Sequence, residues 1–193
     1  VRAKQFVAST MDVHQTFEKY IGRSQLPAAF VKKLDNFQYT QWTIFGLHLA
    51  LHEPVQFHAE KFDPNIRRTL KWSLGAETMD ELLAAHQDVM ANRVPEIVQF
   101  GSGPLSVLDP TQAPPGKHTT YCWHVMPLNP DLGGPSFEAF QDEFSDKIIE
   151  CFARYCPNMT SRNILGRYLY TGRGDVQEMI NMRGGDIFLG GFT

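Results

Sequence analysis

The chain has 193 residues, of which 42% are hydrophobic and 20% are charged. These proportions are typical of a globular protein and exclude a disordered chain, and no apolar stretch approaches the roughly 18 residues of a membrane-spanning helix. The net charge of −3 provides no basic field for nucleic acid, whose phosphates require clustered lysines and arginines. We therefore expect a folded chain with no nucleic-acid partner and no transmembrane segment.

The number and spacing of the cysteines indicate the redox environment of the protein. Three cysteines without a CxxC spacing argue against a disulfide framework and favour a reducing environment. The N-terminal stretch "VRAKQFVAST" has no apolar signal core. We expect a cytoplasmic location, and a peripheral membrane association of a longer parent protein stays open.

The first forty residues predict a strand followed by two short helices. The run "QFVAS" is rich in β-forming residues, and "TMDVHQTFEKYIG" has helical spacing, with Asp12 near its start and Gly22 past its end. The stretch "LPAAFVKKLDNF" predicts a second helix, because Pro27 suits a first turn and apolar residues recur at helical spacing.

A long strand is predicted over residues 42–52. The stretch "WTIFGLHLALHEP" alternates with period two and ends at Pro54. One face of this strand is aliphatic and aromatic, whereas the other is mixed and carries Ile44, Gly46 and His48. The mixed face is either the lining of a cavity or a surface of ordinary packing and solvent exposure.

The remaining elements complete the predicted fold. Thr78 and Glu81 form a capping box ahead of the helix "LLAAHQDVMA". The β-rich runs "PEIVQFGSGPLSVLDP" and "GKHTTYCWHVMPLNP" predict antiparallel strands joined by the loop "DPTQAPPGK". The longest helix is "PSFEAFQDEFSDKIIECFARYC", whose apolar stripe we interpret as core. Without regular βα alternation, the order predicts an α+β fold with a mixed, largely antiparallel sheet and helices packed mainly on one face.

The residues alone identify no reaction. His48 and His52 lie four residues apart, about 13 Å along a strand, whereas two imidazoles on one zinc must each place a nitrogen about 2 Å from it. Cys122 and His124 of "CWH" lie about 6.6 Å apart on a strand, beyond the hydrogen-bond reach of a nucleophile and its base. We therefore expect no metal site, and the catalytic residues stay unassigned.

The C-terminal stretch "YLYTGRGDVQEMINMRGGDIFLGGFT" has the order of a dinucleotide site: a strand, a glycine turn and a helix. Its glycine pattern is incomplete, because Gln177 stands where a third small residue would let helix and strand pack closely. We interpret Gly172 and Gly174 as a close-packed turn rather than a phosphate cradle.

Three widely spaced stretches carry a family resemblance. They are "AKQFVASTMDVHQTFEKYIG", "SVLDPTQAPPGKHTTYCWHVMP" and "NMRGGDIFLGGF". Together they resemble the phytoene-desaturase-like branch of the FAD-dependent oxidoreductases in the amine-oxidase superfamily. The middle stretch is the most specific, since it resembles that family's strand, Asp-Pro, Ala-Pro-x-Gly-x-His turn and return strand.

The resemblance implies three segments. Residues 1–10 resemble a strand of a flavin domain, residues 11–183 a substrate-binding domain, and residues 184–193 a return segment toward the flavin domain. The family's strand and G-x-G-x-x-G turn, which hold the ADP part of FAD, do not occur in this sequence. We therefore expect FAD in a longer parent protein, and we expect this chain alone to be inactive and not to retain FAD.

The resemblance also implies site residues. For the cofactor these are Ser9, Thr10, Gly184, Gly185 and Asp186; for the substrate they are Ile44, Gly46, His48, His118 and Phe188. The implied substrate is apolar, with an isoprenoid as the family's frequent case, and the implied partner is the flavin domain of the same parent chain. An unpaired N-terminal strand would also favour a homo-oligomer. The alternative is an independent α+β module that binds an apolar ligand or a partner protein.

Overall fold

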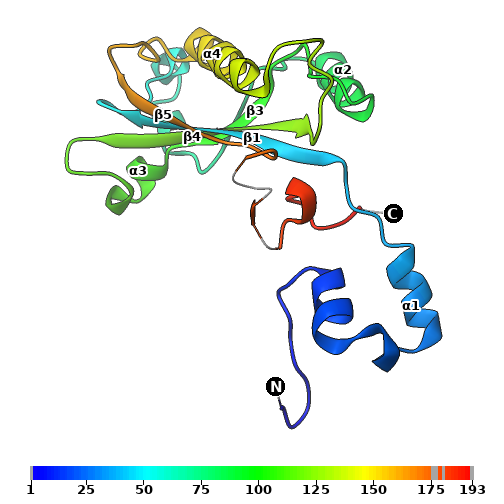
Figure 1. Ribbon diagram of the computed structural model, residues 1–193. Coiled ribbons are helices and arrows are strands. Elements are labelled where there is room, and N and C mark those ends of the chain that lie inside the picture. Colours follow the sequence, from blue (N-terminus) through cyan, green and yellow to red (C-terminus); the bar gives the residue numbers. More distant parts are fainter. Residues whose placement is uncertain (1, 175–177, 180, 192–193) are drawn as a thin grey trace.

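The computed structural model describes residues 2–174, 178–179 and 181–191. Its centre is a five-stranded sheet with the order β2-β3-β4-β1-β5, in which every neighbouring pair is antiparallel. The strands are β1 (Trp42–Leu51), β2 (Trp72–Leu74), β3 (Phe100–Gly103), β4 (His118–Pro127) and β5 (Ile164–Tyr170). Helices α2 (Met79–Met90) and α4 (Phe137–Tyr155) lie on one side of the sheet, and the short α3 (Leu105–Leu108) lies on the other (Figure 1). The predicted α+β fold is confirmed.

The core lies between β1 and α4. The alternation predicted for β1 is confirmed, because Phe45, Leu47, Leu49 and Leu51 are all buried. The Phe45 ring lies 5.0 Å from the ring of Phe144, on the apolar stripe of α4. Ile148 and Phe152 of the same stripe are fully buried. This stripe is therefore core, as its spacing predicts.

The two covering helices begin at side-chain caps. The Thr78 Oγ1 atom accepts a hydrogen bond from the Glu81 N–H at 3.2 Å, and the Glu81 carboxylate accepts one from the Thr78 N–H at 3.1 Å. This confirms the predicted capping box of α2. At α4, the Ser136 hydroxyl accepts from the Ala139 N–H at 3.2 Å. Such bonds satisfy backbone groups that have no partner within the helix.

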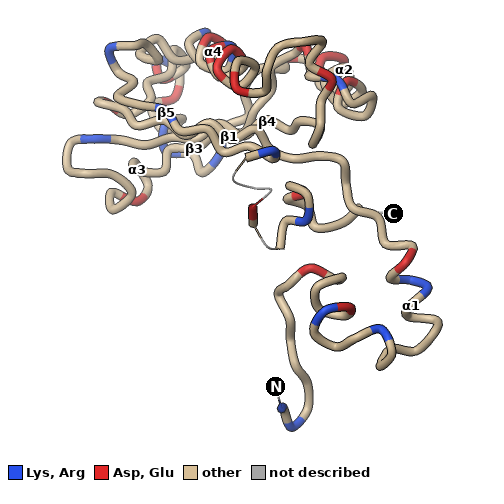
Figure 2. Tube along the Cα trace, viewed as in Figure 1, with Lys and Arg blue, Asp and Glu red and all other residues tan. Residues whose placement is uncertain are grey.

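Charged residues lie mainly on helices and connecting segments (Figure 2). Among the five strands, only β5 carries a Lys, Arg, Asp or Glu, namely Arg167. Its guanidinium donates to Ser145 at 2.7 Å and to Asp146 at 2.5 Å, so it is bound to α4. In the described part of the chain, no helix has the length and apolar character needed to cross a bilayer.

The β-rich run "PEIVQFGSGPLSVLDP" contains the predicted antiparallel strand, because β3 pairs with β4, but the strand is shorter than the run. Only Phe100–Gly103 is extended, and α3 follows. Pro104 has no N–H with which to continue the ladder. Its carbonyl instead accepts from the N–H groups of Val107 at 3.1 Å and Leu108 at 3.2 Å, which starts the helix.

The N-terminal segment, which we expect to lack its natural sheet neighbours, makes no strand pairing over the described residues 2–10. The expected poor burial is confirmed, since Phe6 is 77% exposed and Val7 is 62% exposed. The proposed homo-oligomer through this segment stays a prediction, and this structure provides no strand to support it.

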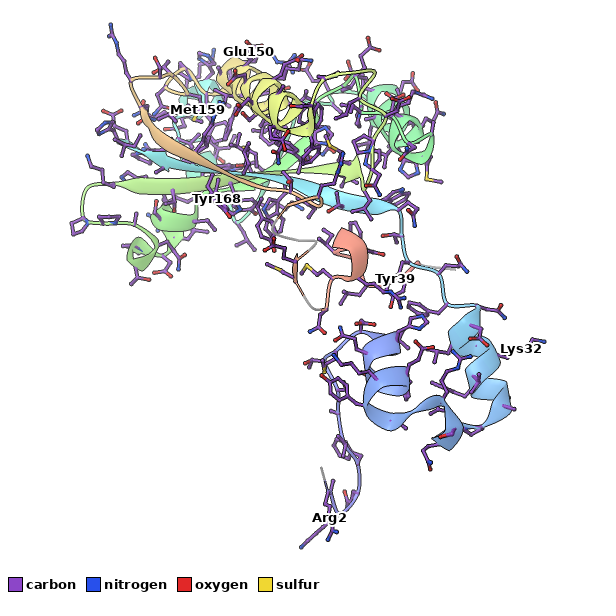
Figure 3. All side chains as sticks on the ribbon, viewed as in Figure 1. Arg2, Lys32, Tyr39, Glu150, Met159 and Tyr168 are labelled. Carbon is purple, nitrogen blue, oxygen red and sulfur yellow. The ribbon has the colours of Figure 1, made fainter. Side chains whose placement is uncertain are left out.

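The two predicted N-terminal helices are present as a π-helix, η1 (Gln15–Ile21), and as α1 (Ala28–Asp35). Asp12 anchors the start of η1: its Oδ1 accepts from the His14 N–H at 3.0 Å, the Gln15 N–H at 3.1 Å and the Tyr39 hydroxyl at 3.0 Å. Burial acts to raise the pKa of Asp12, but these hydrogen bonds outweigh it and hold that pKa below its ordinary value. Tyr39 thus joins η1 to the segment entering β1 (Figure 3).

His124 of β4 is a core residue. It is 2% exposed, and its ring makes an edge contact with Phe144 at 5.0 Å. Its Nδ1 donates to the Val125 carbonyl at 2.7 Å. Burial lowers the pKa of His124 to about 4, so the folded protein holds this imidazole neutral at pH 7.

This burial predicts a loss of stability in mild acid. Between pH 6.5 and 4, His124 is protonated in the unfolded chain but neutral in the folded protein. The free energy of unfolding therefore falls as the pH is lowered through this window. The loss from this group reaches about 3 kcal/mol. Urea unfolding at pH 7.5 and 4.5 should show a smaller pH effect in His124→Phe than in the wild type. The exposed histidine variant His58→Phe should keep the wild-type pH effect, and an unchanged effect in His124→Phe would contradict this assignment.

Candidate functional site

The sheet face opposite α4 forms the candidate site. Side chains alternate along a strand, so Ile44, Gly46 and His48 lie on the face opposite Phe45. In the strand register, His48 stands beside Tyr121 of β4 and Tyr168 of β5. We define the open face as the surface formed by Ile44, Gly46, His48, Tyr121, Trp123, Val125, Tyr168 and Tyr170.

Large aromatic and apolar side chains of the open face are exposed. Trp123 is 47% exposed, Tyr168 57% and Val125 38%. Tyr168 projects on the side of the sheet away from α4 (Figure 3). Contiguous exposed apolar surface of this kind is typical of an interaction or ligand-binding site.

Gly46 keeps the middle of the open face free of a side chain. A Cβ atom at this position would lie 3.0 Å from the Tyr170 carbonyl oxygen and 3.7 Å from Cδ1 of Trp123. The ring of Tyr121 lies over another glycine, since a Cβ on Gly103 would come within 3.1 Å of Tyr121 Cε1. The rings of Tyr121 and Trp123 are 4.9 Å apart. Both glycines are buried, so Tyr170 and Trp123 pack directly over the backbone of Gly46, as Tyr121 does over that of Gly103.

His48 is the ionisable imidazole of this surface. It is half-buried, and burial lowers the pKa of His48 below its ordinary value. A neutral imidazole can donate or accept one hydrogen bond without placing a charge on an apolar surface. Across the described ranges, no group of three or more His, Cys, Asp or Glu residues could hold a metal ion.

The buried cysteines do not contribute a nucleophile to the open face. Cys122 lies on the core side of β4, opposite Leu47 in the register. It is fully buried, and burial raises the pKa of its thiol. A thiol is reactive as the thiolate, so burial supports the interpretation that "CWH" is structural.

The other two predicted substrate residues lie toward the ends of the sheet. His118 stands opposite Leu51 in the register, and its Nδ1 lies 3.2 Å from the Ser106 hydroxyl of α3. Phe188 is 37% exposed and lines a pocket with Trp42 and Val125. The structure therefore brings together Ile44, Gly46 and His48, and it places His118 and Phe188 apart from them at opposite ends of β4.

The predicted cofactor residues fall into two groups. Ser9 and Thr10 are exposed beside η1, where the Ser9 hydroxyl lies 2.8 Å from that of Thr16. Gly184 and Gly185 have φ values of 66° and 96°, which favour glycine. A Cβ on Gly185 would lie 2.3 Å from the Gly172 carbonyl oxygen, so the second glycine is required by close packing.

Asp186 ties the return segment to the start of β1. It is fully buried, and its Oδ1 accepts from the Thr40 hydroxyl at 2.7 Å and from the N–H groups of Phe188 at 2.8 Å and Leu189 at 3.2 Å. The Thr40 contact joins residues 146 positions apart, and no local sequence signal marks it. This oxygen of Asp186 is thus already used within the chain.

The glycine turn after β5 is packed against β1 and α4. A Cβ on Gly172 would lie 2.5 Å from the Thr43 side chain. The Thr171 hydroxyl accepts from the Gln141 side chain at 2.8 Å, and the Arg173 guanidinium lies 4.7 Å from the centre of the Phe137 ring. These contacts support the interpretation as a close-packed turn. The helix predicted after it falls largely on residues 175–177 and 180, outside the described residues.

This α+β unit, with one covered face and one aromatic open face, is similar in sequence to parts of longer proteins. No family model matches the chain. It is 26% identical over 185 residues to a limonene dehydrogenase component of Castellaniella defragrans, covering 89% of this chain and 32% of that protein. It is also 26% identical over 192 residues to pyridine nucleotide-disulfide oxidoreductase domain-containing protein 2 of Mus musculus, covering 97% and 32%.

The chain thus spans about a third of the length of these two relatives. Their names and the length of the match support a relationship to oxidoreductases.

Replacing Asp186 tests its structural role. Asp186→Ala removes three hydrogen bonds of a buried carboxylate, and we expect a loss of about 2–4 kcal/mol in unfolding free energy. Thr40→Val removes one of the three hydrogen bonds and should lower the unfolding free energy by less than Asp186→Ala does. Hydrogen exchange at the Phe188 and Leu189 amides should accelerate in Asp186→Ala. Unchanged exchange at both amides would show that Asp186 does not hold this segment.

Proposed function

We propose that this chain is the substrate-binding part of a flavin-dependent oxidoreductase of the phytoene-desaturase-like type, and that the open face lines its substrate cavity. The observation that carries the proposal is the open face itself, in which the large side chains of Trp123, Val125 and Tyr168 are exposed on one face of the sheet. The oxidoreductase relatives, about three times as long as the matched region, support it.

The residues of this chain fit only an edge contact with FAD. A Cβ at Gly184 would meet no atom within 4 Å, so the backbone there is open to a neighbouring group. The buried Asp186 uses its Oδ1 within the chain. The chain offers no G-x-G-x-x-G turn for the pyrophosphate. The parent protein's remaining residues would therefore hold the cofactor, which removes electrons from a C–H bond of the substrate when bound.

The open face is suited to orienting an apolar substrate. Trp123, Tyr121 and Tyr168 offer ring surfaces for dispersion contacts with a hydrocarbon. The strand residues that form the open face include no Lys, Arg, Asp or Glu. An apolar substrate that binds there therefore displaces little tightly bound water from the open face. Covering this surface with a flavin domain would exclude water from the cavity. Within this proposal, an isoprenoid hydrocarbon such as limonene is the substrate class we favour.

The complete reading frame provides the first test. Its product should bind a flavin, detected by visible absorption after gel filtration, whereas the 193-residue chain alone should not. Anaerobic addition of limonene to the complete protein should bleach the flavin absorption. A reading frame confined to these residues, with ligand binding but no flavin, would support the independent binding module instead.

Filling the open face provides the second test. Gly46→Leu places a branched side chain against Tyr170 and Trp123, and we expect it to slow flavin reduction by limonene at least about tenfold. Tyr168→Ala should weaken substrate binding through lost ring contact. The matched control is Tyr20→Ala, since Tyr20 is 60% exposed on η1. Equal rates in Gly46→Leu and the wild type, with flavin content preserved, would exclude the open face as the substrate surface.

A further inference from the structure

A cleft separate from the open face lies where β1 ends and β4 begins. Its volume is about 570 Å³, and four chain segments line it: Pro54 after β1, residues within 64–68, residues within 106–110 of α3 and the short helix after it, and residues 114–118. The lining contains four basic side chains, from Arg67, Arg68, Lys117 and His118. None of the lining residues is an Asp or a Glu. In a chain with a net charge of −3, this is a local concentration of positive charge.

Two of the four basic side chains of the cleft, Lys117 and His118, have polar contacts with their neighbours. The Lys117 ammonium donates to Nδ1 of His52 at 3.0 Å. His118 lies 3.2 Å from the buried Ser106 hydroxyl, which also accepts from the Thr119 N–H at 3.0 Å. Polar contacts of this kind restrict the side chains before a ligand binds, so less conformational entropy is lost on binding.

The local sequence builds the turn that presents two of these groups. In Pro114-Pro115-Gly116-Lys117, the Lys117 N–H donates to the Pro114 carbonyl at 3.0 Å, and Gly116 has a φ of 73°. This is the pattern of a type II turn, which favours Pro at its second position and Gly at its third. The turn therefore places Lys117 and His118 at the start of β4, where they line the cleft together with Arg67 and Arg68.

We propose that this cleft binds the phosphate group of an anionic ligand. Arginine presents several N–H donors in a planar fork that matches phosphate oxygens. Lys117 adds a compact positive charge, and His118 a further ring nitrogen. Arg67 also pairs with Glu60 at 3.1 Å, whereas the exposed Arg68 has no acidic partner among the salt bridges of the described residues. Arg68 and Lys117 are thus the two cations most available to the ligand.

A phosphate group can come from a soluble diphosphate or from a phospholipid headgroup, and both present the same oxygens. Calorimetric titration of the whole chain with inorganic pyrophosphate at low salt tests the first source. Cosedimentation with phosphatidylcholine vesicles, with and without phosphatidic acid, tests the second. We expect saturable binding in at least one of the two assays, and vesicle binding should require phosphatidic acid.

Charge variants make the test specific. Arg68→Ala and Lys117→Ala should each weaken the observed binding about tenfold. Lys147→Ala is the matched control, because Lys147 lies on α4 outside the cleft and pairs with Glu143 at 2.7 Å. It should bind like the wild type, and thermal unfolding should show that all three variants are folded.

Two results would overturn the proposal. One is the absence of binding in both assays; the other is an equal loss of affinity in Lys147→Ala and Arg68→Ala, which would indicate general charge attraction. The test is separate from that of the proposed function, because Gly46→Leu alters the open face and should leave pyrophosphate or vesicle binding unchanged.

Discussion

The packing of β1 against α4 is the contact on which the other features depend. β1 is bonded along both edges, to β4 and to β5, and one of its faces is buried under the aromatic stripe of α4. Burial of each such large apolar side chain stabilises the fold by about 1.5–3 kcal/mol. Because successive side chains of a strand point to opposite faces, this burial also fixes Ile44, Gly46 and His48 on the open face. The core therefore determines which residues are available as a site.

The middle and the ends of the sheet are stabilised by different interactions. The middle is held by apolar packing, whereas polar contacts connect segments at both ends. At the start of β1, the buried Asp186 carboxylate holds Thr40; at its far end, His52 meets Lys117. This separation leaves an apolar open face between two polar regions, which is the arrangement expected for a surface that holds an apolar body and excludes charge.

The exposure of the open face agrees with the lengths of the relatives. Single exposed apolar residues are ordinary on protein surfaces, but here Trp123 and Val125 of β4 share one face of the sheet with Tyr168 of β5. The chain spans about a third of the two oxidoreductase relatives. A surface of this kind would become interior if the rest of such a protein covered it, and the proposed substrate cavity follows from that covering.

The sequence by itself determined the features that depend on near neighbours. The period-two pattern predicted β1, the Thr78–Glu81 pair predicted the start of α2, and the apolar spacing predicted α4, because each reflects hydrogen bonds or burial within one element. It also placed Ile44, Gly46 and His48 on one face. Only the tertiary structure showed which residues pack over Gly46, since Trp123 and Tyr170 come from strands distant in sequence. The sequence likewise could not reveal that Asp186 holds Thr40. A strand's partners and a buried carboxylate's donors are long-range contacts, and local propensity does not encode them.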